Sequence, residues 1–110
     1  MARKGETWNE SETYRDAWTL RQVRRVTTRG IYNQTPNYHT NIGFSADSEH
    51  LVFATRREHG SALMRCHVST GDITQLTDNV EDVIKGGSLC LAPRSGWLAY
   101  VTSNQVRAVN

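Results

Sequence analysis

The chain of 110 residues is long enough for one small domain and too short for a multi-domain enzyme. Its 13 basic and 11 acidic residues give a formal net charge of +2, which does not indicate a nucleic-acid partner. No apolar run approaches the roughly 18 residues of a membrane-spanning helix, so no membrane interaction is expected. The first residues lack the apolar segment of a secretory signal, and two cysteines, Cys66 and Cys90, are too few for a disulfide framework. These features predict a cytoplasmic protein whose cysteines stay reduced and pack as small core residues.

Short apolar runs that alternate with polar turns predict an all-β chain without a long helix. Residues 1–11 are expected to form a flexible tail in which Trp8 is mobile. The turn at residues 69–72 contains Gly71, which can supply the positive φ of a hairpin turn. The earlier hairpin has Thr19-Leu20-Arg21 at this place and needs another kind of turn. In chain order the expected strands are residues 12–16, 22–27, 40–44, 51–55, 62–68, 73–76, 87–91, 97–102 and 105–109.

The strongest internal signal is a repeat. Residues 44–55 align without a gap on residues 91–102, at an offset of 47, and both copies contain an apolar residue, a polar turn and an apolar strand. A repeat of about 40–50 residues with four strands is typical of β-propeller blades. In this interpretation residues 12–110 form a partial propeller. Its parts are one complete blade at residues 40–76, an incomplete blade at 87–109, and the hairpin 12–27 as the edge of a third.

About two blades do not close a ring. Closed propellers have about four to eight blades, and one repeat cannot bury both of its faces alone. The chain is therefore expected to be a fragment of a longer protein or, as the less favoured alternative, to assemble from several copies. Open sheet edges and uncovered apolar faces predict that the isolated chain is marginally stable, oligomeric or insoluble.

The repeated segment resembles the WD-like repeat of TolB-type propeller proteins. That repeat reads roughly F-S-P-D-G-x-x-L-x-F, then a glycine, a strand, and G-x-x-x-x-L-T. Ala46 and Ser48 stand here in place of its proline and first glycine. The positions that match it are Phe44-Ser45-Ala46-Asp47, Leu51-Val52-Phe53, Gly60 and Gly71-Asp72-Ile73-Thr74-Gln75-Leu76-Thr77.

The order of features along nearly the whole chain resembles the N-terminal part of the oligogalacturonate lyases. These features are the hairpin at 12–27, a loop with Asn37-Tyr38, the blade that starts at Phe44, and Gly86-Gly87 at the start of the next blade. The resemblance implies a seven-bladed ring and a polysaccharide lyase that splits pectin-derived oligogalacturonates by β-elimination in the cytoplasm. It also implies a divalent metal, typically manganese, held by histidines and a glutamine of later blades, together with a basic residue that removes the proton. No position of this chain matches those residues, so neither a catalytic residue nor a metal ligand is assigned, and no cofactor is expected in the chain itself.

Four residues are the candidates for contact with substrate. In a propeller blade the loops 28–39, 56–61 and 77–86 share one rim. Arginine can bind a carboxylate of a uronic acid with two parallel hydrogen bonds, and an aromatic ring can stack on a sugar. For each candidate, the alternative role is packing of the blade junction or a solvated surface position. The candidates are Tyr38, His39, Arg56 and Arg57.

Other conspicuous residues are interpreted as structural. The four histidines lack metal-ligand spacing along the sequence. His67 is expected to pack across strands, His50 to be a solvated turn residue, and Trp97 to lie in the core. Arg24 and Arg25 point to opposite faces of a strand, so they are expected to be solvated edge charges rather than a phosphate-binding row.

The sequence thus favours the N-terminal segment of an oligogalacturonate-lyase-like propeller that is inactive on its own. Its expected partners are oligogalacturonate in the full-length parent, and the remaining blades or further copies of the chain. The alternative is a non-catalytic TolB-type propeller segment that acts as a protein-interaction platform. A cluster of metal-binding histidines in later sequence would distinguish the lyase from the platform.

Overall fold

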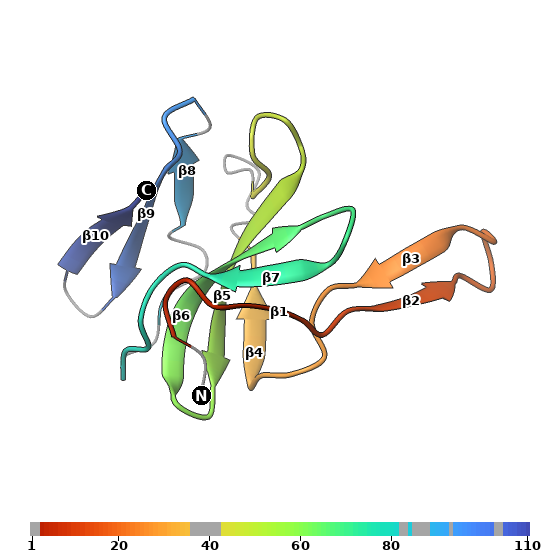
Figure 1. Cartoon of the computed structure of the whole chain (residues 1–110), viewed down its shortest axis with the longest axis horizontal. Helices are drawn as coiled ribbons and strands as arrows, with labels where there is room; N and C mark the ends of the chain where they lie inside the picture. Colours follow the sequence, from red (N-terminus) through yellow and green to blue (C-terminus); the bar gives the residue numbers. More distant parts are fainter. Residues whose placement is uncertain (1–2, 36–42, 82–83, 85–88, 93, 103–104) are drawn as a thin grey trace.

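The computed structural model of the chain describes residues 3–35, 43–81, 84, 89–92, 94–102 and 105–110. Over these ranges the chain forms ten β-strands and no helix, which confirms the predicted all-β class. The described residues accordingly contain no helix that is long and apolar enough to cross a membrane. The strands pair antiparallel and form sheets of five, three and two strands (Figure 1).

The five-stranded sheet lies in the middle of the molecule and has the strand order β1-β7-β6-β5-β4 (Figure 1). Its longest strands, β5 and β6, form a hairpin with Glu58 and His59 in the turn. Gly60 follows this turn with a φ of 121°, and a Cβ atom there would run into the carbonyl oxygen of Val80, so only glycine fits. The strands are β1 Thr7–Asn9, β4 Tyr32–Gln34, β5 His50–Arg57, β6 Gly60–His67 and β7 Asp72–Gln75.

The edge of β5 that faces away from β6 is covered by two separate stretches of chain. Tyr32 to Gln34 of β4 pair with Arg56 to Ala54, and Phe44 forms a single bridge with Leu51. From the sequence, the first stretch was expected to be a loop and residues 40–44 were expected to be a strand. Residues 40–42 lie outside the described residues, whereas β4 arises because backbone groups of residues 31–34 find partners on the distant strand β5.

The N-terminal region differs from the tail that was expected at residues 1–11. Thr7–Asn9 form β1, which pairs with β7 at the outer edge of the central sheet. Trp8 packs against the buried cluster on one face of that sheet. Two effects favour this arrangement. Pairing with β1 satisfies the open backbone N–H and C=O groups at the edge of β7, and packing of Trp8 removes apolar indole surface from water.

Hydrophobic side chains cover both faces of the central sheet. Because successive strand residues point to opposite faces, Val52 and Ala54 lie on one face and Phe53 lies on the other. The cluster on the first face comprises Val52, Ala54, Leu63, Ile84, Leu89, Leu98 and Tyr100. The cluster on the second face comprises Phe53, Ala62, Met64, Cys66 and Ile73, with Trp8 and Val26 packed against it. A sheet that is apolar on both faces is one that packs between two layers.

The three-stranded sheet covers the first of these faces. It has the strand order β10-β9-β8, with β8 Cys90–Ala92, β9 Trp97–Thr102 and β10 Gln105–Val109. Leu91 pairs with Leu98 in the same way that Phe44 pairs with Leu51, and the two pairs are related by the 47-residue offset seen in the sequence. Two core predictions are wrong here, because Trp97 and Cys90 are exposed on this outer sheet, while Cys66 is buried as expected.

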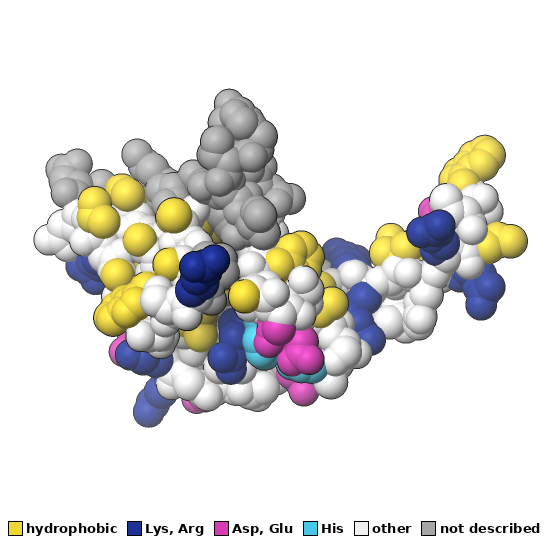
Figure 2. All heavy atoms as spheres, turned by 90° about the horizontal axis from the view of Figure 1, so that it is seen from above, with side chains coloured by type: hydrophobic (Ala, Val, Ile, Leu, Met, Phe, Trp, Pro, Cys, Tyr) yellow, Lys and Arg dark blue, Asp and Glu magenta, His cyan; other side chains and the backbone are white. Residues whose placement is uncertain are grey.

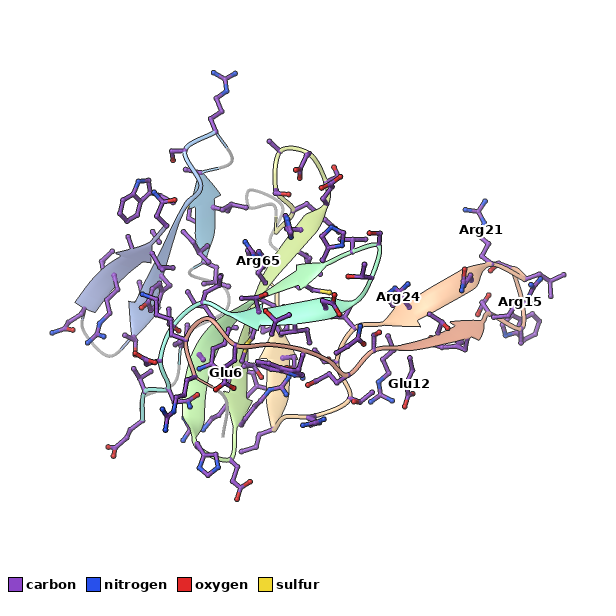
Figure 3. The ribbon with its side chains drawn as sticks, viewed as in Figure 1. Glu6, Glu12, Arg15, Arg21, Arg24 and Arg65 are labelled. Atoms are coloured by element: carbon purple, nitrogen blue, oxygen red, sulfur yellow. The ribbon has the colours of Figure 1, made fainter. Side chains whose placement is uncertain are left out.

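The hairpin of β2 (Glu12–Arg15) and β3 (Gln22–Arg25) projects away from the central sheet (Figures 1 and 2). In place of a glycine, Leu20 takes a φ of 60°, and Asp16 caps the turn by accepting hydrogen bonds from Thr19. Arg24 joins the hairpin to the central sheet by donating to the carbonyl oxygens of Ser69 and Thr70 (Figure 3). Figure 2 shows hydrophobic side chains at the far end of the hairpin, where Trp18 is 94% exposed.

Candidate functional site

A buried ion pair organises the second face of the central sheet. Glu10 directly follows β1, and its side chain is only 1% exposed, while Arg57 ends β5. The two groups form a paired contact: Arg57 Nη1 donates to Glu10 Oε2 at 2.7 Å, and Nη2 donates to Oε1 at 2.8 Å. Trp8 Nε1 donates to the same carboxylate at 2.8 Å, as do the backbone N–H groups of Thr28 and Arg29 at 3.2 Å. One carboxylate therefore ties together the N-terminal segment, the segment that follows β3 and the end of β5.

The environment of Glu10 stabilises its ionised form. Burial alone acts to raise the pKa of this carboxyl, but the hydrogen bonds from Arg57 and Trp8 and the charge of Arg57 outweigh burial. The pKa of Glu10 is lowered from 4.5 to about 2. The pair is thus fully charged at neutral pH, and the positive charge of Arg57 is already balanced inside the protein.

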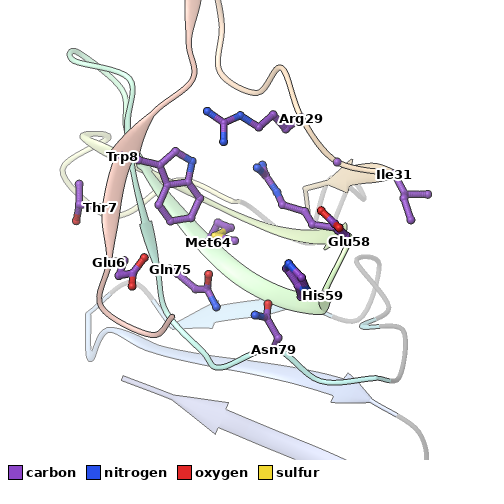
Figure 4. Close-up of a pocket in the computed structure, with 12 residues that line it drawn as sticks. Glu6, Thr7, Trp8, Arg29, Ile31, Glu58, His59, Met64, Gln75 and Asn79 are labelled. Carbon is purple, nitrogen blue, oxygen red and sulfur yellow. The ribbon is translucent and has the colours of Figure 1, made fainter. Parts of the chain in front are cut away.

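A hollow of about 660 Å³ opens beside this pair (Figure 4). Trp8 and Met64 form an apolar wall, and Arg29, Arg57 and His59 bring basic groups to it. The guanidinium carbon of Arg57 lies 5.9 Å from the centre of the Trp8 ring, which is within the range of a cation–π contact. The other lining residues are Glu6, Thr7, Gly30, Ile31, Glu58, Gln75 and Asn79. Because Glu10 balances Arg57, and Glu6 and Glu58 line the hollow together with Arg29, the charges of the lining do not favour an anionic ligand.

Three loops meet at one end of the central sheet, as the propeller interpretation predicted. The N–H of Ile31 donates to the carbonyl oxygen of Arg56 at 2.7 Å, and Ser61 and Val80 exchange backbone hydrogen bonds at 2.8 and 2.9 Å. The described parts of the loops 28–39, 56–61 and 77–86 therefore lie side by side.

Of the two predicted substrate-contact residues that the structure describes, one lines the hollow. Arg57 does so, with its Nη atoms bound to Glu10 and its Nε bound to Thr55 Oγ1 at 3.0 Å. Arg56 donates instead to Ser61 Oγ at 3.2 Å and to the carbonyl oxygen of Glu81 at 3.0 Å. The two arginines thus make separate sets of contacts, as neighbours on a strand do. Tyr38 and His39 lie outside the described residues.

Two groups of residues were not predicted from the sequence. Glu10 and Trp8 were assigned to a tail, although a Trp-x-Glu segment with an alternating pattern could have indicated a strand. His50 and His67 are 17 positions apart in the sequence, but they pair directly across β5 and β6. A hairpin with a two-residue turn before Gly60 fixes this register and could have revealed the pair. Together with Glu49 they are a group of potential metal ligands among the described residues.

The central antiparallel sheet, which is apolar on both faces and covered on one of them by the three-stranded sheet, defines the class as an all-β protein built from stacked sheets. No family model and no curated protein sequence matches the chain. Among solved structures, the chain superposes on an oligogalacturonate lyase in complex with manganese with a TM-score of 0.73, at 26% identity, over 92% of this chain and 26% of that one. It superposes on the oligogalacturonate lyase of Vibrio parahaemolyticus with a TM-score of 0.71, at 23% identity, over 90% of this chain and 26% of that one.

The resemblance to oligogalacturonate lyases that the sequence indicated is therefore confirmed by structural similarity. The chain spans about a quarter of the length of the two lyases.

Proposed function

We propose that the chain is the N-terminal segment of an oligogalacturonate-lyase-like β-propeller. In this proposal β5, β6 and β7, with the interrupted inner strand at residues 32–34 and 43–44, are one complete blade of a seven-bladed ring. The sheet β8–β10 is an incomplete blade, and the hairpin β2–β3 is the edge of a third. The observation that supports this most strongly is the superposition of 92% of the chain on a quarter of a lyase. The two apolar faces of the central sheet also favour it, because a blade packs between two neighbours.

The full-length parent is proposed to split oligogalacturonates by β-elimination in the cytoplasm. One of the similar lyases is a complex with manganese, and a manganese ion in the parent is proposed to be held by histidines and a glutamine of later blades. No residue of this chain is assigned to that ion or to proton abstraction. The segment would supply scaffold and part of the substrate rim, and would catalyse nothing alone.

Tyr38, His39, Arg56 and Arg57 remain the residues that we propose to contact substrate. Because Glu10 holds both Nη atoms of Arg57, an incoming carboxylate would have to compete with it. Nη1 of Arg56 already binds a hydroxyl and a carbonyl group, neither of which carries a charge, so the charge of Arg56 stays available to a uronate. Of the two arginines, Arg56 is therefore the better candidate for binding the substrate carboxylate.

The test is an assay of the full-length protein that contains this segment. Digalacturonate and manganese are added, and the ultraviolet absorbance of the unsaturated product is followed. The proposal predicts steady growth of absorbance, and it predicts that Arg56→Lys raises KM more than it lowers kcat, because a lysine cannot form the paired hydrogen bonds. Arg94→Lys, in the exposed turn between β8 and β9, is the matched control and should behave as wild type. Absence of product from a folded, manganese-loaded protein would contradict the lyase proposal.

One observation favours the alternative of a protein-interaction platform. The hairpin β2–β3 carries Tyr14, Trp18 and Leu20 with 55%, 94% and 65% of their surface exposed. In the lyase proposal other blades of the same ring cover these side chains. In the platform alternative a separate protein covers them, so they would remain exposed in the folded full-length protein. Fluorescence of Trp18 in that protein, compared with a Trp18→Phe variant, separates a buried indole from an exposed one.

A further inference from the structure

Two histidines and a glutamate meet at the end of the central sheet opposite the Glu58-His59 turn. His50 is the first residue of β5 and His67 is the last residue of β6, and the two are direct cross-strand partners. Their ring centres are 5.1 Å apart, and the ring planes make an angle of 74°. Glu49 precedes β5, and one potential ligand atom from each of the three residues lies within 4.8 Å of the others. Figure 2 shows histidine and acidic side chains together on this face.

The turn that follows β6 orients the ring of His67. Its Nδ1 lies 3.0 Å from Ser69 Oγ and 3.3 Å from Thr70 Oγ1. Either hydroxyl can accept a hydrogen bond from Nδ1–H, and this tautomer leaves the lone pair of Nε2 free to bind a metal ion. Metal-binding histidines in proteins characteristically donate their other N–H to such a partner, which fixes the ring. The N–H of Val68 also donates to the carbonyl oxygen of Glu49 at 2.8 Å, so the turn holds all three residues near one another.

His50 provides an independent observation. Its Nδ1 atom is buried and has no hydrogen-bond partner among the described residues. A buried polar atom without a partner costs about 1–3 kcal/mol, and native proteins rarely leave one without an ion or water beside it. One histidine of the cluster therefore carries a buried nitrogen without a partner, as a metal ligand without its ion would.

We propose that Glu49, His50 and His67 form a binding site for Zn²⁺. Imidazole nitrogens and a carboxylate oxygen are its usual nitrogen and oxygen ligands, and three protein ligands leave a fourth position for water. Bond lengths of about 2.0–2.2 Å require the ligand atoms to approach to roughly 3.3 Å from one another. Because Glu49 is exposed, its side chain can make most of this movement.

The charges around the site influence its affinity for Zn²⁺. The carboxylate of Glu49 favours a cation, whereas Arg24 lies near the turn that holds His67. Arg24 donates to the carbonyl oxygens of Ser69 and Thr70, which carry no charge, so its own charge is not balanced there and opposes the ion. The site is therefore expected to bind Zn²⁺ more weakly than a closed four-ligand structural site does. A bound ion would link the start of β5 to the end of β6 and stabilise the sheet by mass action.

The experiment is a Zn²⁺ titration of the untagged chain, followed through the NMR signals of the histidine ring nitrogens. A Cys90→Ser background removes the exposed thiol, which would also bind zinc. We expect one ion per chain, with large shifts for His50 and His67 and none for His59, which lies in the turn at the other end of the hairpin. His67→Gln should weaken binding at least tenfold, and His59→Gln should leave it unchanged.

A second variant keeps the proposal testable if His67→Gln fails to fold. If circular dichroism shows that His67→Gln does not fold, Glu49→Gln replaces it, because Glu49 is exposed and its removal should weaken binding several-fold without loss of structure. Saturation with Zn²⁺ that leaves the His50 and His67 signals in place would overturn the proposal. Equal affinity of a folded His67→Gln or Glu49→Gln variant and its parent would overturn it as well.

Discussion

Replacing Glu10 with glutamine is expected to destabilise the folded chain by about 3 kcal/mol at pH 7. The pKa of Glu10 is about 2 instead of 4.5, and one pH unit corresponds to about 1.36 kcal/mol, so ionised Glu10 contributes about 3 kcal/mol to folding. Glu10→Gln preserves the size of the side chain but leaves Arg57, only 18% exposed, without its counter-charge. Removal of one partner of a buried ion pair typically costs about 3–5 kcal/mol, which agrees with this estimate.

The effect of Glu10→Gln should depend on pH in a specific direction. Because the folded-state pKa is lowered, the contribution of Glu10 is fully present above pH 4.5 and is lost as the pH falls toward about 2. Wild type should lose this stability over that range, whereas the glutamine variant has no group to titrate at this position. At about pH 3 the difference in free energy of unfolding between the two should be less than half of its value at pH 7.

The assay is urea unfolding at both pH values, with Glu12→Gln as the matched control. Glu12 lies on exposed β2, so its replacement should change the free energy of unfolding by no more than about 0.5 kcal/mol. Equal stability of wild type and Glu10→Gln at pH 7, or a difference that does not shrink at pH 3, would refute the reasoning. If Glu10→Gln shows no folded baseline in urea, the Glu10 carboxyl of wild type is titrated by NMR instead. A titration midpoint near pH 4.5 instead of about 2 would also refute the reasoning.

Three further predictions follow from the fold. Gly60→Ala should lower the urea midpoint strongly, because the new Cβ atom meets the carbonyl group of Val80. Gly5→Ala is the control: Gly5 has a φ of 89° but open space around it, so the substitution should cost only backbone strain. Equal effects of the two substitutions would contradict the close contact at Gly60. The isolated chain should elute as oligomers in size-exclusion chromatography because its sheet edges and apolar faces are open, and a stable monomer would count against this. The isolated chain should give no unsaturated product from digalacturonate and manganese, and product formation that disappears in His39→Ala would make His39 catalytic.

The local parts of the fold were predictable from the sequence. The strands at residues 51–55, 62–68 and 73–76 follow from short apolar runs, and Gly71 has the positive φ expected of it, at 82°. The hairpin at residues 12–27 was also predicted. The structure of its turn was not, because Leu20 takes the positive φ that is usually found at glycine and Asp16 accepts the hydrogen bond from Thr19.

The parts that were not predictable depend on contacts between distant residues. β1 exists because the edge of β7, some 65 residues later in the chain, offers backbone partners to Thr7–Asn9. The paired contact of Glu10 with Arg57 joins positions 47 residues apart. Trp97 occupies a strand position that is usually buried, but it lies on the outer sheet and is 49% exposed. Sequence periodicity shows that successive residues of a strand point to opposite faces, but only the tertiary arrangement shows which face is covered.

The central claim is that this chain is the first part of a lyase-like propeller, and reading the coding region past Asn110 tests it most directly. The account predicts further repeats of about 40–50 residues with four short strands each, enough to complete a ring. It also predicts, within those repeats, a set of histidines and a glutamine able to hold manganese. A coding region that ends at Asn110, or that continues without such repeats, would contradict it.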